Sequence, residues 1–328
     1  MPNTRTPFVE IAQSRTDLTD DEIAHLQLLL ADWTLIADLA FADLILWLPT
    51  WNEAGFVAAA QIRPTTARTH IPEDLVGRFA PRGRHAELDR AFATAQIAQG
   101  AGTVGHEITQ AIPVKSGDRT VAIIGCYAEV TQSGRLENVY AACAVELFHM
   151  VTAGTFPRPT GNDQGTGGRG GAPRVGDGLM LLDERGVIEF ASPNARSAFR
   201  RLGLALDIEG QVLAELAASL NRRGVPINDT LSLVARGRIQ GTAEIEGAQS
   251  AATMRSIPLQ GKKTIILIRD VSDLRRREQA LVGKDAAIRE IHHRVKNNLQ
   301  TVASLLRIQG RRLNDASARS AIAEAGRR

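Results

Sequence analysis

The sequence predicts an α+β protein whose last part is one long helix. Two groups of β-rich runs, at 41–130 and 178–270, are broken by turn residues such as Gly, Asn, Asp and Pro. Residues with helical spacing flank the first group, at 19–33 and 136–152. After residue 273, apolar residues recur at spacings of three and four, which is typical of one buried helical stripe. Antiparallel sheets with helices packed on them account for the first two observations.

The first helix is predicted to begin after Thr19. The hydroxyl of Thr19 can cap the helix, and Glu22, three residues later, completes the capping-box pattern before an apolar run. Residues 41–49 then suit a helix or a strand, and residues 55–63 suit a strand, with turn residues between them.

A hairpin is predicted later in the same group. Two β-rich runs, 107–114 and 120–130, are joined by residues 115–118, whose sequence is Lys-Ser-Gly-Asp. Helical spacing resumes at 136–152. The order helix, strands, hairpin, helix favours an antiparallel sheet with its terminal helices packed on it.

A basic segment lies between the strands predicted at 55–63 and 107–114. It contains His70, Arg78, Arg82, Arg84 and His85. Such side chains could contact an anionic ligand in a cavity roofed by loops. A solvated loop face explains the same residues. The sequence therefore singles out no pocket residue here.

Residues 158–174 are predicted to form a linker, because Gly, Pro and polar residues dominate without apolar periodicity. The linker contains a literal GxGxxG at 165–170, but Pro159 and Pro173 flank it where a phosphate-binding loop needs a strand and a helix. We interpret this match as accidental.

The second group of runs predicts another antiparallel sheet around a helical middle. The first two strands are expected at 178–183 and 186–191, followed by a short helix at 195–202. Three further strands are expected at the end of the group, at 241–246, 252–258 and 264–270.

Composition narrows the class of protein. A chain of 328 residues with 44% hydrophobic residues can build two domains and a tail. Residues 262–328 hold sixteen basic and seven acidic residues, a net charge of +9, so the preceding residues carry −6 of the total of +3. Because this basic end has no aromatic residue that could stack on bases, solvated helix faces are favoured over direct nucleic-acid binding.

Cysteine usage and hydropathy exclude further classes. Cys126 and Cys143 have neither CxxC spacing nor a clustered histidine, so no metal site or disulfide is predicted, and both are expected to be small core residues. The most apolar region, 26–48, is interrupted by Asp32, Asp38 and Asp43, and the N-terminus has no apolar signal core. The sequence therefore predicts a cytoplasmic chain with no membrane span.

The long C-terminal helix carries a narrow apolar stripe, and leucines recur in it every seven residues, at Leu299, Leu306 and Leu313. A stripe this narrow usually packs against a partner helix in a bundle. The other members of the stripe are Ile288, Ile291, Val295 and Val302.

Two adjacent histidines fall in this helix, and helical geometry turns them about 100° apart. His292 lies on the apolar stripe, three residues before Val295. His293 lies with the polar residues of the opposite face, where a largely neutral imidazole could act as a nucleophile. Nearby cations from Arg289, Arg294 and Lys296 could stabilise an incoming phosphoryl group. For a lone exposed histidine, the alternative is one more polar residue on a solvated face.

The surrounding string HHRVKNNLQ resembles the phosphoacceptor box of a subclass of histidine kinases, in which Arg follows the reactive histidine. The resemblance implies that His293 is the phosphoacceptor and that Arg294, Lys296, Asn297 and Asn298 complete the box. More familiar boxes have an acidic residue after the histidine, so the general base stays open. Glu290, one turn before His293, is a candidate.

The preceding regions resemble the sensors of actinobacterial cytosolic sensor histidine kinases. DWTLIADLAFADLILWLP at 32–49 and GTFP at 154–157 are similar to their divergent GAF-type domain. GLMLLDERGVIEFASPNARSAF at the start and IILIRDVSDLRRRE at the end of 175–273 resemble a PAS domain. The resemblance implies a GAF-like domain at 1–157, a linker at 158–174, a PAS domain at 175–273, and a signalling helix with the start of the phosphoacceptor domain at 274–328.

The resemblance implies a function for the longer protein. It would be a homodimer that autophosphorylates from ATP on His293 and passes the phosphoryl group to an Asp of a response regulator of the RNA-binding antiterminator type. ATP and Mg would bind a catalytic domain that this sequence lacks, so the chain alone is expected to be inactive. The sensor ligand is unknown, and a small molecule in the GAF-like or PAS domain is expected. With no cysteine in 175–273, a cysteine-linked flavin is excluded there.

Two alternatives stay open. The chain could be a complete GAF-PAS dimeric scaffold or a phosphotransfer protein without its own kinase activity. Its basic helical end could instead bind RNA.

Overall fold

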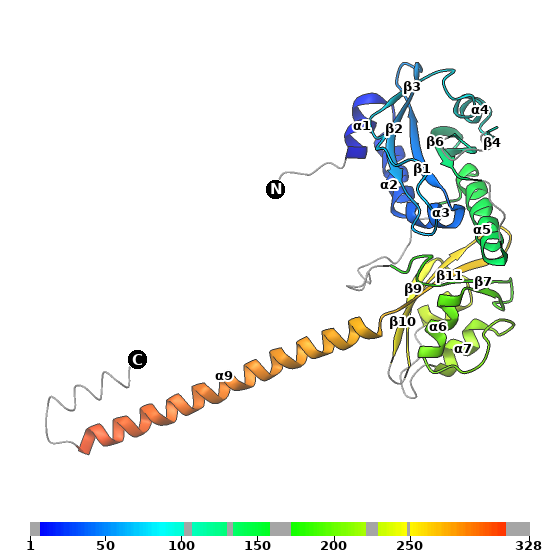
Figure 1. Cartoon of the computed structure of the whole chain (residues 1–328). Coiled ribbons are helices and arrows are strands. Elements are labelled where there is room, and N and C mark those ends of the chain that lie inside the picture. The colour runs from blue at the N-terminus through cyan, green and yellow to red at the C-terminus, as the bar shows by residue number, and fades with distance from the viewer. Residues whose placement is uncertain are drawn as a thin grey trace. The chain divides into compact units, whose positions relative to one another are not determined.

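A computed structural model describes residues 7–101, 107–129, 134–157, 172–220, 229–247 and 250–312 of the chain. The chain divides into two compact units, Met1–Val271 and Ser272–Arg328. The first unit holds two antiparallel sheets with helices packed on them, and the second holds the long helix α9 (Figure 1). The predicted α+β fold class is confirmed.

The N-terminal sheet has six strands in the order β3-β2-β1-β6-β5-β4, and every neighbouring pair is antiparallel. Its central strand β1 is buried along its whole length. The strands are β1 (Asp43–Pro49), β2 (Gly55–Ile62), β3 (Phe79–Pro81), β4 (Ala98–Gln99), β5 (Gln110–Ser116) and β6 (Arg119–Tyr127), and the helices are α1 (Pro7–Arg15), α2 (Asp20–Ala31), α3 (Trp33–Ala40), α4 (Ala86–Thr94) and α5 (Arg135–Thr152).

The C-terminal sheet has five antiparallel strands in the order β8-β7-β11-β10-β9, with helices between its second and third strands in sequence. This agrees with the predicted arrangement of five strands around a helical middle. The strands are β7 (Leu179–Leu182), β8 (Ile188–Ala191), β9 (Gly241–Glu246), β10 (Ala251–Pro258) and β11 (Thr264–Asp270), and the helices are α6 (Pro193–Arg201), α7 (Leu213–Leu220) and α8 (Asp229–Ala235).

The predicted start of the first long helix is confirmed, but its extent is wrong. Thr19 accepts a hydrogen bond from the backbone N–H of Glu22, and the Glu22 carboxylate accepts one from the Thr19 backbone, which makes a full capping box. At Asp32 the run bends by 51° and continues as α3. The ambiguous segment 41–49 is a strand from Asp43, because Phe41 ends α3 in the left-handed region, with φ 50°.

The predicted hairpin is confirmed with a shorter turn. Lys115 and Ser116, predicted as turn residues, belong to β5 and pair with Thr120 and Arg119. A register shift after Val114 keeps them in the ladder, so only Gly117 and Asp118 lie in the turn. The short elements α1, α4, β3 and β4 were not predicted, and α7 and α8 were expected only as part of a helical middle.

One hydrophobic cluster joins the two sheets of the first unit. It includes alternate residues of β1, Leu44, Leu46 and Leu48, together with buried residues of α3 and α5. It also includes one face of the C-terminal sheet, at Leu179, Leu181, Phe190, Ile257, Ile265 and Leu267. The intervening residues Ile45 and Trp47 face a separate cluster on the other side of the N-terminal sheet. The two sheets therefore share one core.

Among the described residues, no single helix is both long and apolar enough to cross a membrane, although the bent pair α2 and α3 passes that test on length and composition. Asp38 in this pair is fully buried, as is Asp43 just beyond it.

Candidate functional site

Helix α9 (Ser272–Arg312) carries the predicted phosphoacceptor box without a break, and it runs through Gly283, which has a low helix propensity. It begins two residues after β11 ends, in agreement with the strand predicted at 264–270 and the helical spacing predicted after residue 273. Because the backbone is regular at 292 and 293, the two histidines point in directions about 100° apart. The last part of the predicted phosphoacceptor domain, residues 313–328, lies outside the described residues.

Both histidine side chains are exposed in the single chain, and neither makes a hydrogen bond or ion pair with another described residue. An imidazole without such a partner keeps its ring nitrogens available for reaction. The burial of His292 against a partner helix stays a prediction.

Glu290 is engaged by the residue after the predicted acceptor. Its Oε1 accepts hydrogen bonds from Arg294 Nη2 at 2.5 Å and Arg294 Nε at 3.1 Å. The two exposed side chains lie four residues apart on one helix face. Such a pair contributes little to stability, and water readily replaces its hydrogen bonds. The structure therefore brings Glu290 to Arg294 and not to His293, and its role as a base stays a prediction. Lys296, Asn297 and Asn298 are exposed on the same helix.

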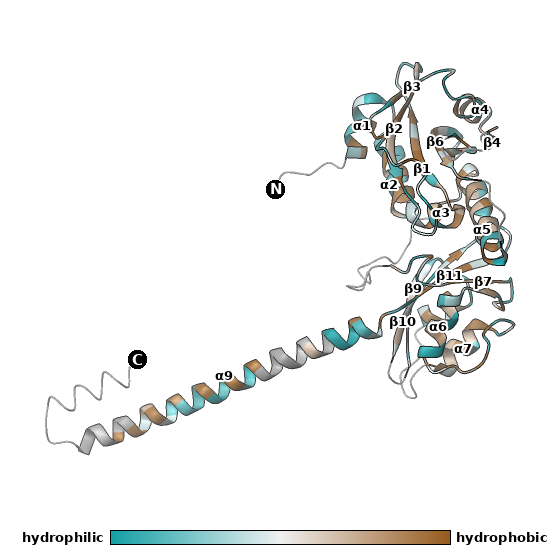
Figure 2. Cartoon of the chain, in the orientation of Figure 1, coloured by the Kyte–Doolittle hydropathy of each residue, from teal (hydrophilic) through white to brown (hydrophobic). Residues whose placement is uncertain are grey.

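The apolar stripe of α9 is open in the single chain. Bands of apolar and polar residues alternate along the helix in Figure 2. Large apolar side chains on it are about half exposed or more: Ile288 51%, Ile291 59%, Val295 48%, Leu299 63%, Val302 51%, Leu305 55% and Ile308 51%. Sequence reasoning had missed Leu305 and Ile308. The side chain of Leu306, and Leu313 altogether, lie outside the described residues. A stripe of this length is what a second helix would cover.

Three aspartates in the first unit have roles that the sequence did not reveal. Asp38 Oδ1 accepts hydrogen bonds from the backbone and hydroxyl of Thr65, at 2.5 Å and 3.0 Å. Asp43 Oδ2 accepts from the backbone N–H groups of His70 and Ile71, at 2.5 Å and 2.6 Å. These two carboxylates hold the loop after β2 against the sheet. The sequence signal for such a role is an acidic residue inside an apolar run, because a buried carboxylate needs a hydrogen-bond or ion-pair partner.

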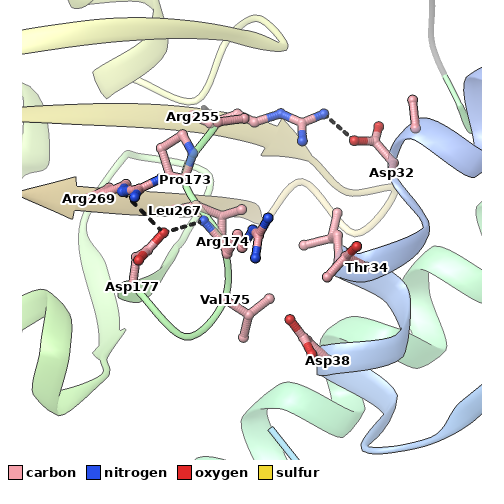
Figure 3. Close-up of a pocket in the computed structure, with 13 residues that line it drawn as sticks. Asp32, Thr34, Asp38, Pro173, Arg174, Val175, Asp177, Arg255, Leu267 and Arg269 are labelled. Atoms are coloured by element: carbon pink, nitrogen blue, oxygen red, sulfur yellow. Dashed lines mark hydrogen bonds and ion pairs between the residues drawn. The ribbon is translucent and has the colours of Figure 1, made fainter. Parts of the chain in front are cut away.

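The third aspartate, Asp32, pairs with a residue of the other sheet. Its Oδ1 lies 2.5 Å from Nη2 of Arg255 in β10, and the two side chains are only 10% and 17% exposed. Burial raises the pKa of Asp38 against the opposing effect of its bonds to Thr65. Figure 3 shows Asp32, Asp38 and Arg255 around one pocket.

The basic middle segment is partly structural. The guanidinium of Arg82 lies over the rings of Phe56 and Phe92 at 4.6 Å and 4.7 Å, and it pairs with Asp89 at 3.1 Å. Arg78 pairs on the surface with Glu73. Burial lowers the pKa of His85, whose ring is tilted against Trp47. This segment is therefore not simply the solvated loop face that was weighed against a ligand site.

The prediction that Cys126 and Cys143 are small core residues is confirmed. Cys126 and Cys143 are free thiols in the core, and burial raises the pKa of each to about 12.

Comparison with known protein families finds one match in the N-terminal part of the sequence and one at its C-terminal end. Residues 8–144 match the family described as histidine kinase PdtaS, GAF domain, and residues 290–328, which contain His293, match the HisKA_2 family, described as histidine kinase. A solved structure described as the sensor region of a sensor histidine kinase is 27% identical. It covers 83% of this chain and is itself covered in full, with a TM-score of 0.67.

Curated relatives match across nearly the whole chain. The sensor histidine kinase PdtaS of Mycolicibacterium smegmatis is 36% identical over 336 residues, and that of Mycobacterium tuberculosis is 35% identical over 343 residues. Each alignment covers 97% of this chain and 66% of the relative, so the chain spans about two thirds of the length of these proteins. With a matching sensor family, a matching phosphoacceptor family and relatives alike over 97% of its length, this chain belongs to the PdtaS-type sensor histidine kinases.

Proposed function

We propose that His293 is the phosphoacceptor of a two-component sensor kinase whose input unit is Met1–Val271. The observation that carries this proposal is the exposed His293 on an unbroken helix, within a match to a histidine kinase family and beside Arg294 and Lys296. These cations would offset the charge of an incoming phosphoryl group.

The proposed reaction joins a ring nitrogen of His293 to the γ-phosphorus of ATP as the bond to the ADP oxygen breaks. ADP leaves with that electron pair, and the imidazole proton passes to a base. The phosphoryl group would then move to an Asp of a response regulator, for which an RNA-binding antiterminator is our proposal. Glu290 could serve as the base only after its exposed pair with Arg294 opens.

ATP and Mg would be bound by a catalytic domain of the longer protein. No group of three or more His, Cys, Asp or Glu side chains placed to hold a metal ion occurs among the described residues. We propose that residues 1–328 alone do not phosphorylate themselves, and that the longer protein works as a cytoplasmic homodimer.

The open stripe on α9 supports the homodimer. Seven large apolar side chains from Ile288 to Ile308 are about half exposed or more, and a second copy would cover them in a parallel helical pair. In such a pair His292, on the stripe, would be buried, while His293 would stay accessible.

The test uses the full-length protein with radiolabelled ATP and maps the phosphosite by mass spectrometry. His293→Gln should abolish labelling, because the nucleophile is lost. His292→Gln is the matched control one residue away and should retain labelling while weakening the dimer. Labelling that persists in the His293 variant would contradict the assignment. Wild-type protein that labels only when a second kinase is added would favour the phosphotransfer alternative.

A further inference from the structure

A polar pocket of about 520 Å³ lies between the two sheets of the first unit. Asp32, which precedes α3, and Thr34 and Asp38 of α3 form one wall, and Arg174, Arg255 and Arg269 form much of the other (Figure 3). Pockets of this size hold small organic ligands in many proteins. None of the residues that line the pocket belongs to α9. One wall comes from the junction of α2 and α3, and the other from residues 172–177 with strands β10 and β11.

The acidic groups of the pocket are already engaged. Asp32 pairs with Arg255 at 2.5 Å, and Asp177 lies 3.9 Å from Arg269. Asp38 accepts a hydrogen bond from the Thr65 backbone N–H at 2.5 Å, and the Thr65 hydroxyl, which donates one hydrogen, lies 3.0 Å from both carboxylate oxygens. A ligand that brought a positive charge would find these carboxylates occupied.

The hydrogen-bond donors that line the pocket have fewer partners than its carboxylate acceptors. A guanidinium has five N–H donors, and Arg255 bonds to Asp32 through one of its nitrogens. The Arg174 guanidinium makes no hydrogen bond or ion pair with any described residue, although it lies within electrostatic range of Asp38. The hydroxyl of Thr34 likewise has no partner within the described chain.

From this imbalance we propose that the pocket binds a small oxyanion, a carboxylate or a phosphate ester. Arg174 and Thr34 are the principal contacts, and Arg255 and Arg269 supply the surrounding positive field. The planar fork of Arg174 suits two oxygens of such a group. A ligand held there would contact β11, which ends two residues before α9 begins. This inference goes beyond the phosphoacceptor function, because binding requires neither His293 nor ATP.

The competing explanation is that the charges serve only to hold the two sheets together. The two explanations predict different behaviour of Arg174. An arginine that stabilises the interface would lower the melting temperature of the free protein when removed. Since the Arg174 guanidinium has no hydrogen-bond or ion-pair partner among the described residues and acts on Asp38 only through its charge, its loss should lower the melting temperature little or not at all.

The test measures binding of inorganic phosphate, succinate and adenosine monophosphate to residues 1–328 by calorimetry, with thermal shift as a second readout. Arg174→Gln should weaken binding about 10- to 100-fold, as expected when a charged hydrogen-bond donor is lost. Thr34→Val should weaken it less. Arg185→Gln is the matched control, since Arg185 is an exposed arginine of the same unit that does not line the pocket. The three probes separate a phosphate ligand from a carboxylate ligand.

Saturable binding that Arg174→Gln impairs and Arg185→Gln preserves would support the proposal. Equal binding by wild type and Arg174→Gln, equal loss in Arg185→Gln, or no binding of any of the three probes would overturn it. A His293→Gln variant should bind as the wild type does. A failure here would therefore leave the phosphoacceptor assignment unaffected, and the reverse also holds.

Discussion

The ion pair between Asp32 and Arg255 gives a quantitative test of how the two sheets are held together. Arg255→Gln leaves the Asp32 carboxylate in a site where only 10% of its side chain is exposed. Removing one partner of a fully buried pair costs about 3–5 kcal/mol, and the remaining exposure here reduces that to about 2–4 kcal/mol. For a unit of this size, about 2 °C per kcal/mol predicts a fall in melting temperature of about 4–8 °C.

The assay is thermal unfolding of residues 1–328, followed by circular dichroism or calorimetry. Arg78→Gln is the matched control, because the Arg78–Glu73 pair is also an Arg–carboxylate pair but has both side chains at least 60% exposed. This control should cost at most about 0.5 kcal/mol. Asp32→Asn combined with Arg255→Gln should cost less than the sum of the single variants, by about 1–3 kcal/mol of coupling. If Arg255→Gln melts no lower than Arg78→Gln, the pair contributes nothing and the reasoning fails.

Two further predictions concern buried titratable groups. Burial raises the pKa of Asp38 above 3.8, so the folded state favours the protonated carboxyl group. The stability that this group contributes to the fold is complete below pH 3.8 and is lost as the pH rises through the folded-state pKa. The melting temperature of Asp38→Asn relative to wild type should therefore increase from acidic to neutral pH, and an unchanged difference would contradict the raised pKa. Cys126 and Cys143, with pKa values of about 12, should resist a thiol reagent at mildly alkaline pH in the native chain and react in denaturant, whereas fast native labelling would contradict their burial.

Local patterns predicted much of the fold. The capping box at Thr19 and Glu22 lies within four residues, so the physical cause and its sequence signal coincide. The strands of the C-terminal sheet and the junction at Asp270 and Ser272 were readable for the same reason. The bend at Asp32 was not, because the apolar spacing continues across it, and the ion-pair partner of Asp32 lies more than 200 positions away.

The candidate site divides in the same way. The phosphoacceptor box is one continuous string on one helix, so spacing alone placed His293 and His292 on different faces. The polar pocket of Figure 3 is built from the junction of α2 and α3, the segment at 172–177 and strands β10 and β11, which only the folded chain brings together. The sequence presented Asp32 and Asp38 as interruptions of an apolar run, without their partners Arg255 and Thr65.

The core shared by the two sheets bears on how such sensors can be recombined. Leu179, Leu181 and Leu267 of the C-terminal sheet are at most 8% exposed because they pack in the same cluster as Leu44 and Leu46 of the N-terminal sheet. If the part of the chain that holds one sheet were transplanted alone onto another kinase, the apolar face that the other sheet covers would be exposed to solvent. In this chain the unit to exchange is accordingly the pair of sheets, with its boundary at the start of α9 and not at residues 158–174.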